Sequence, residues 1–78
     1  MEGKEKMRKM TEKVKYIGSW SANNGSSYGG GYEFTNKKEA IKTMRDISRG
    51  NTFAGNVGRW HVTDAESLKE IAAGRVNM

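Results

Sequence analysis

Three residues in the second half of the chain, His61, Asp64 and Ser67, are of the types that form a nucleophilic catalytic site. Such a site needs the histidine within hydrogen-bonding reach of the serine, and a carboxylate that orients the ring. Asp64 and Ser67 also stand where a predicted helix begins, and both residue types are common helix caps. We therefore expect structural roles for Asp64 and Ser67 and a surface position for His61 on an open sheet face, and we predict that the protein is not an enzyme.

The sequence predicts neither a metal site nor a cofactor. There is no cysteine, and the single histidine, His61, would leave a zinc ion dependent on carboxylates. The segment from Gly50 to Val57 has two glycines at the spacing of a phosphate-binding loop, but it lacks that loop's lysine and hydroxyl. Gly29 to Gly31 lack the spacing and the following helix of a dinucleotide-binding motif.

Basic residues are in excess, with 14 Lys and Arg against 9 Asp and Glu, a net charge of +5 and a pI near 9.7. A basic surface attracts nucleic acid, a nucleoprotein complex or an acidic protein surface. The candidate binding residues are Lys13, Lys15, Arg59 and His61, which alternation places on one face of the predicted sheet. We expect a small non-enzymatic binding protein that docks on a nucleic acid or nucleoprotein complex through these basic residues.

The elements that position these residues belong to one small domain, which we place at residues 13–78. Residues 1–12 are rich in Lys and Glu and predict a charged, flexible tail. No apolar run is long enough to span a membrane, and the first residues lack the apolar core of a signal peptide. We therefore expect a cytoplasmic protein without membrane contact.

The stretch from Val14 to Phe34 has the period of two that is typical of strands, interrupted by the turn-forming pair Asn24-Gly25. It predicts an antiparallel hairpin in which Trp20 lies opposite Tyr28, Gly18 opposite Gly30, Tyr16 opposite Tyr32, and Val14 opposite Phe34. The matched glycines leave a gap on this aromatic face, which predicts that a helix approaches there through Met44. Because all these aromatics share the helix side, we expect none for base stacking on the other face.

Two helices and a third strand are predicted after the hairpin. The first helix spans residues 36–49, with Asn36 as its cap, Glu39 at the capping-box position and Gly50 as its end. Residues 57–63 alternate as a strand, and a second helix runs from Thr63 or Asp64 to Gly74. Residues 75–78 are either a frayed end or a short closing strand. The predicted fold is therefore α+β, a small, mainly antiparallel sheet in β-β-α-β-α order with both helices on one face.

Two loops offer another way of binding a partner. Residues 21–27 and 51–56 are rich in small polar residues, and they present Asn24 and Phe53. Phe53 is either an exposed apolar anchor or a cap on the core. The alternative function is a protein–protein inhibitor or adaptor that uses these loops without nucleic acid. The first or third strand could also pair edge to edge, giving a homodimer in place of a monomer.

In size and build the chain resembles the small, cysteine-free accessory proteins that phages encode, including inhibitors of the anti-CRISPR type. The resemblance rests on composition and on the one-layer α+β architecture, and no functional residue carries over from it. It implies action by binding and not by catalysis.

Overall fold

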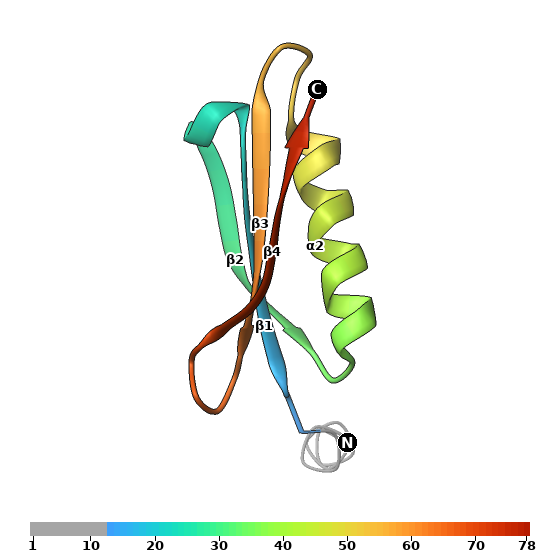
Figure 1. The fold of residues 1–78 in the computed structure, drawn as a ribbon, viewed down its shortest axis with the longest axis vertical. Helices are drawn as coiled ribbons and strands as arrows, with labels where there is room; N and C mark the ends of the chain where they lie inside the picture. Colours follow the sequence, from blue (N-terminus) through green and yellow to red (C-terminus); the bar gives the residue numbers. More distant parts are fainter. Residues whose placement is uncertain (1–12) are drawn as a thin grey trace, which may run out of the picture.

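The computed structural model describes residues 13–78, which form a four-stranded antiparallel sheet with one α-helix along one face (Figure 1). The elements are β1 (Tyr16–Ala22), the short 3-10 turn η1 (Asn23–Gly25), β2 (Ser27–Phe34), α2 (Lys37–Asn51), β3 (Val57–Asp64) and β4 (Glu70–Asn77). The tail expected at residues 1–12 lies outside the described residues. The α+β class, the antiparallel sheet and the position of the first helix agree with the prediction.

The predicted second helix is wrong, because the chain turns back into β4 and gives the order β-β-α-β-β. The Asp64 carboxylate does accept the backbone N–H groups of Glu66 and Ser67, as a helix cap would. These bonds close a tight reversal instead, in which the N–H of Asp64 donates to the carbonyl of Lys69. Leu68 adopts a left-handed conformation (φ 62°) in this turn, which ends any helical path.

The strand order is β2-β1-β3-β4, so β1 and β3 are interior strands. The expectation that the first or third strand could pair edge to edge is therefore wrong, because both edges of each strand are already occupied. The helix connection returns β3 to the free side of β1, and β4 then adds beyond β3. The two edges of the sheet are β2 and β4.

The hairpin of β1 and β2 forms, but its predicted register is wrong. The partners are Tyr16 with Phe34, Gly18 with Tyr32, and Trp20 with Gly29, with an irregularity after Gly18. Gly31 has φ of +79° at this place, a conformation that glycine adopts at little cost. The extra residue shifts the rest of β2 by one position, and side chains beyond it change faces.

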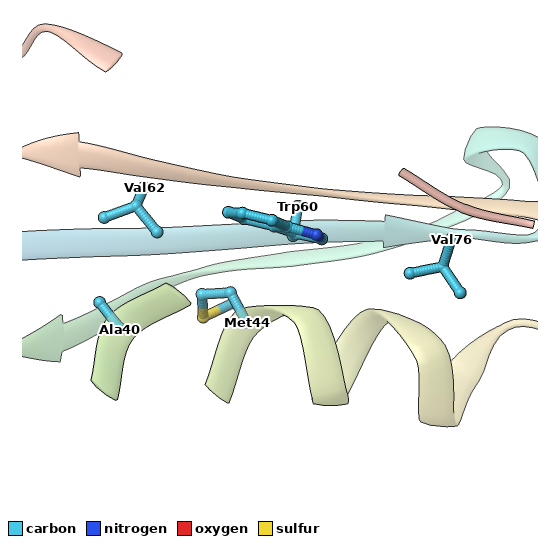
Figure 2. Close-up of a cluster of buried hydrophobic side chains, with 5 residues drawn as sticks. All are labelled: Ala40, Met44, Trp60, Val62 and Val76. Carbon is cyan, nitrogen blue, oxygen red and sulfur yellow. The ribbon is translucent and has the colours of Figure 1, made fainter. Parts of the chain in front are cut away.

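The core lies between α2 and the middle of the sheet. Figure 2 shows Trp60 between Val62 and Val76 on the sheet, with Met44 and Ala40 pointing toward them from α2. Met44 is fully buried and occupies the space above Gly18, where a Cβ atom would collide with its side chain. The expected approach of Met44 to this glycine is thus confirmed.

The two tryptophans form one row across the sheet, on its helix side. Trp20 of β1 lies directly opposite Trp60 of β3. Each indole covers a glycine of the adjoining edge strand, Trp20 over Gly29 and Trp60 over Gly74, and a Cβ atom at either glycine would come within about 2.6 Å of the ring. The edge glycines therefore give the indoles the room that they need.

The helix begins as predicted but ends later. The Asn36 side chain accepts the N–H of Glu39, which confirms the cap. Gly50 does not end the helix, which continues to Asn51. Below this last turn the buried Ser48 hydroxyl donates to the carbonyl of Ser21, and it ties α2 to the sheet. No helix among the described residues is long and apolar enough to cross a membrane.

Candidate functional site

The face of the sheet turned away from α2, which we call the open face, carries the candidate site. Strand alternation gives this face the odd-numbered residues of β1 and β3, including Ser19, Ser21, Arg59 and His61. None of the described helices lies against it (Figure 1). Arg59 and His61 thus lie on the face of the sheet on which the sequence places them.

Tyr28 belongs to the open face, contrary to the expectation from sequence. The shifted register sets Tyr28 opposite Ser21, whereas its neighbour Gly29 takes the place beside Trp20. The Tyr28 side chain is 79% exposed, the largest exposure of any aromatic residue described. The open face thus has an aromatic ring that the predicted register assigns to the core.

Four residues form a single row across all four strands: Tyr28, Ser21, Arg59 and Arg75. We call this row the basic row. Arg59 and Arg75 are both exposed and lie directly opposite each other on β3 and β4. Neither forms an ion pair within residues 13–78. Like charges that face each other across two strands are destabilising, so the fold itself gains nothing from this pair.

The next row of the open face is nearly flat. It consists of Gly30, Ser19, His61 and Ala73. Only His61 is large, and its Nδ1 lies 2.9 Å from a carboxylate oxygen of Glu70. This contact holds the imidazole toward the end of β3 that is farther from the basic row. A shallow floor of small residues therefore adjoins Tyr28 and Arg59.

Lys13 and Lys15 do not join Arg59 in one patch. The carbonyl of Lys15 accepts the N–H of Ala65, so Lys15 lies at the far end of β3 from Arg59. Six residues of strand separate the two positions, which corresponds to about 20 Å. A hollow of about 320 Å³ lies at that end, between residues 13–16 and 64–66, and it contains charges of both signs.

The two loops form a single hydrogen-bonded junction. Asn23 and Asn24 of η1 both adopt left-handed conformations and direct their amides toward the α2–β3 loop. The side-chain Oδ1 of Asn23 accepts the backbone N–H of Phe53 and an N–H of the Asn56 side chain. Asn24 donates to the Asn56 side chain and accepts the N–H of Val57. The polar atoms of Asn24 are thus engaged within the protein.

Phe53 is 71% exposed, which places it outside the core and rules out the core-capping alternative. Its backbone is fixed by the bond to Asn23, so the ring projects from an anchored position. It lies in the α2–β3 loop, at the junction that ends the sheet, and it does not belong to the basic row.

His61, Asp64 and Ser67 do not converge into a catalytic site. His61 contacts Glu70, whereas Asp64 accepts the backbone N–H groups of Ser67 and Glu66. These backbone bonds, that of Ser67 foremost, hold the pKa of Asp64 below its usual value. Within residues 13–78 no group of three metal-ligating side chains is present.

The exposed side of α2 carries a second set of cations, on the other side of the molecule from the basic row. This set consists of Lys37, Lys38, Lys42, Arg45 and Arg49. Asp46 stands among them and is 3.0 Å from Nζ of Lys42. That hydrogen bond, together with Arg45 and Arg49, lowers the pKa of Asp46. The helix cations are thus partly neutralised, in contrast to the basic row.

Sequence reasoning missed Arg75 and Tyr28. Arg75 follows the predicted second helix, in a segment that the sequence leaves open as a frayed end or a short closing strand, and it is not among the predicted binding residues. Residues 71–77 are nevertheless rich in the small and β-branched types that suit an edge strand. Tyr28 could be placed only by locating the irregularity at Gly31, and three consecutive glycines give no signal for which one is bulged.

No family model, curated protein or solved structure matches the chain. The open face and its charges are therefore the basis for a functional assignment.

Proposed function

We propose that this is a non-enzymatic binding protein that docks, in the cytoplasm, on a nucleic acid or a nucleoprotein complex through the basic row. One observation carries the proposal: Arg59 and Arg75 lie directly opposite each other, exposed and without an acidic partner among the described residues. Their mutual repulsion opposes folding. An anionic partner that binds both guanidinium groups would relieve this repulsion, and the free energy so gained would add to its affinity.

Phosphate groups are the anions that fit this arrangement. A guanidinium group binds a phosphate through two parallel N–H···O bonds, which makes arginine well suited to nucleic-acid backbones. Each phosphate contact also releases counterions, so the affinity falls as salt rises.

The test compares two pairs of arginines that have the same chemistry and different places. Arg59→Gln with Arg75→Gln removes both charges of the basic row, and Arg45→Gln with Arg49→Gln removes two charges from α2. Fluorescence anisotropy with labelled oligonucleotides, at several salt concentrations, measures the affinity of each. We expect the basic-row variant to lose at least about tenfold in affinity. The slope of log K against log salt should fall by about 1.4 for a single strand or about 1.8 for a duplex.

The α2 variant has the same net charge as the basic-row variant, so it controls for nonspecific attraction. It should retain most of the affinity and the salt slope of the unaltered protein. An equal loss in both variants would show that net charge alone drives binding. Affinity that does not respond to salt would overturn the proposal as well.

A protein–protein inhibitor or adaptor is the second candidate, and the exposed ring of Phe53 favours it. In that case the anchored junction of Asn23 and Phe53 presents an apolar group to a protein surface. A pull-down from host lysate with nuclease treatment tests this idea. Retention of a defined protein after nuclease digestion, and its loss in Phe53→Ala at an unchanged melting temperature, would favour this candidate over the basic row.

A further inference from the structure

We infer that the open face binds single-stranded nucleic acid, with a base stacked on Tyr28 and the backbone phosphates on Arg59 and Arg75. The inference rests on the proposed function and adds the kind of nucleic acid and a residue that selects it. It depends on the register of β2, because only the observed register brings an aromatic ring into the row of arginines.

The surroundings of Tyr28 leave room for a flat ligand. The three residues that follow it on β2 are glycines, and its partner on β1 is Ser21. No bulky side chain of these positions competes for the space beside the ring, and the adjoining row contributes only Gly30 and Ser19 near it. An exposed aromatic side chain above a floor of small residues is the arrangement on which unpaired bases stack.

The spacing across the sheet suits a chain that runs over the strands. Neighbouring strands lie about 4.8 Å apart, so Arg59 is about 10 Å and Arg75 about 14 Å from Tyr28 along the row, measured between backbones. A single strand with one base on Tyr28 thus passes over both guanidinium groups when its backbone crosses β3 and β4. The order aromatic, hydroxyl, cation, cation gives a stacking platform next to an electrostatic track.

A duplex fits the open face less well. Four strands span about 14 Å between the outer backbones before side chains are added. The major groove of B-form DNA is about 12 Å wide and accepts a helix or a two-stranded ribbon. The open face can therefore touch only the phosphates of a duplex, and Tyr28 finds no accessible base there. Only Arg59 and Arg75 would contribute to the binding of a duplex, whereas a single strand contacts Tyr28 as well.

The experiment measures the affinity of the complete chain for two probes, an oligothymidylate of about 12 nucleotides and a duplex of the same length. The unaltered protein should bind the single strand more tightly. Tyr28→Ala should weaken binding of the oligothymidylate by about 5- to 150-fold, the range found for the loss of one stacked base. Tyr28→Phe keeps the ring and should bind within about twofold of the unaltered protein. Duplex binding should not respond to either change.

Phe53→Ala is the matched control, because Phe53 is an aromatic residue of similar exposure that lies outside the basic row. It should leave the affinity for the oligothymidylate unchanged. Thermal unfolding of Tyr28→Ala should match that of the unaltered protein, since the ring is 79% exposed.

The outcomes separate this inference from the proposed function. If Tyr28→Ala binds the oligothymidylate normally while the Arg59 and Arg75 double variant does not, docking on phosphate stands and base stacking is overturned. Equal binding of both probes, with no effect of Tyr28→Ala, also overturns it. If neither probe binds at low salt, the proposed function and the inference both fail.

Discussion

The two faces of the sheet follow different rules. On the face covered by α2, the fit decides which residue can occupy a position: Met44 fills the space above Gly18, and Trp60 covers Gly74. On the open face, Arg59 and Arg75 are both exposed, and their charges repel each other. The same four strands thus carry one surface that specifies the fold and one that the fold leaves unconstrained.

This difference indicates where function is to be sought. A residue on the covered face is accounted for once its neighbours are known. On the open face, packing does not account for Tyr28 and the two arginines, and the proposed nucleic-acid partner would account for them. Substitutions on the two faces should accordingly separate stability from binding.

The largest expected effect belongs to Met44→Ala on the covered face. Met44 is fully buried among Ala40, Trp60 and Val62. Its truncation leaves a cavity and should lower the free energy of unfolding by about 2–5 kcal/mol, measured by urea titration. Tyr28→Ala on the open face is the counterpart and should stay within about 0.5 kcal/mol of the unaltered protein. Similar losses in both variants would erase the distinction between the faces.

A pair of glycines sharpens the comparison with one identical change. A Cβ atom at Gly58, on the covered face, would collide with the Thr52 hydroxyl and come within 2.5 Å of the Ser48 hydroxyl. Gly58→Ala should therefore destabilise the protein by about 1–3 kcal/mol. At Gly30, on the open face, the nearest atom would be 3.4 Å away. Gly30→Ala should be neutral or slightly stabilising in thermal melts, because alanine gives up less backbone entropy than glycine.

Arg75→Gln should have a smaller effect, and one of opposite sign. It removes the like-charge pair with Arg59, so the free energy of unfolding should rise by about 0.2–1 kcal/mol at low ionic strength. The gain should shrink as salt is added, because the repulsion is screened. Stability and nucleic-acid affinity would then move in opposite directions. A loss of stability in Arg75→Gln would instead give this arginine a structural role.

The smallest effect is expected at the end of β3, where Asp64 accepts two backbone N–H groups. These bonds depress its pKa in the folded state, so they stabilise the fold above the unfolded-state value of about 3.8. That stability is lost as the pH falls through the lower, folded pKa. Between about pH 5 and pH 2, the free energy of unfolding should therefore change less with pH in Asp64→Asn than in the unaltered protein.

Asp46→Asn provides the comparison for this titration. The pKa of Asp46 is lowered mainly by the hydrogen bond from Lys42, an exposed ion pair that salt screens. Added salt should therefore reduce the pH effect of Asp46 more than that of Asp64. The opposite order would contradict the assignment of the Asp64 shift to backbone donors.

The sequence was sufficient where a local pattern decides the outcome. The start of the helix after Asn36 was predictable, because the capping hydrogen bond joins residues only three apart in the sequence. The approach of Met44 to Gly18 was also predictable, since a glycine on an aromatic face leaves a space that a neighbour must fill. The faces of Arg59 and His61 followed from simple alternation.

The sequence was insufficient where two local structures share one signal. Asp64 is an equally good cap for a helix and for a tight turn, and only the pairing of β4 with β3 decides between them. The alternation on β2 fails at Gly31, because a single bulged residue reverses the faces beyond it. Both errors bear on the candidate site, since they concealed Arg75 and Tyr28.

The row of two tryptophans has a consequence for the way the chain folds. Each indole covers a glycine of its own hairpin, and a hairpin can form locally within microseconds. The pairing of Trp20 with Trp60, in contrast, brings together residues about 40 positions apart in the chain. The chain between the two tryptophans includes α2, which packs on both β1 and β3. Tryptophan fluorescence of Trp60→Phe would thus follow the β1–β2 hairpin, and that of Trp20→Phe would follow the β3–β4 hairpin. A slow phase common to both variants would report the pairing of β1 with β3.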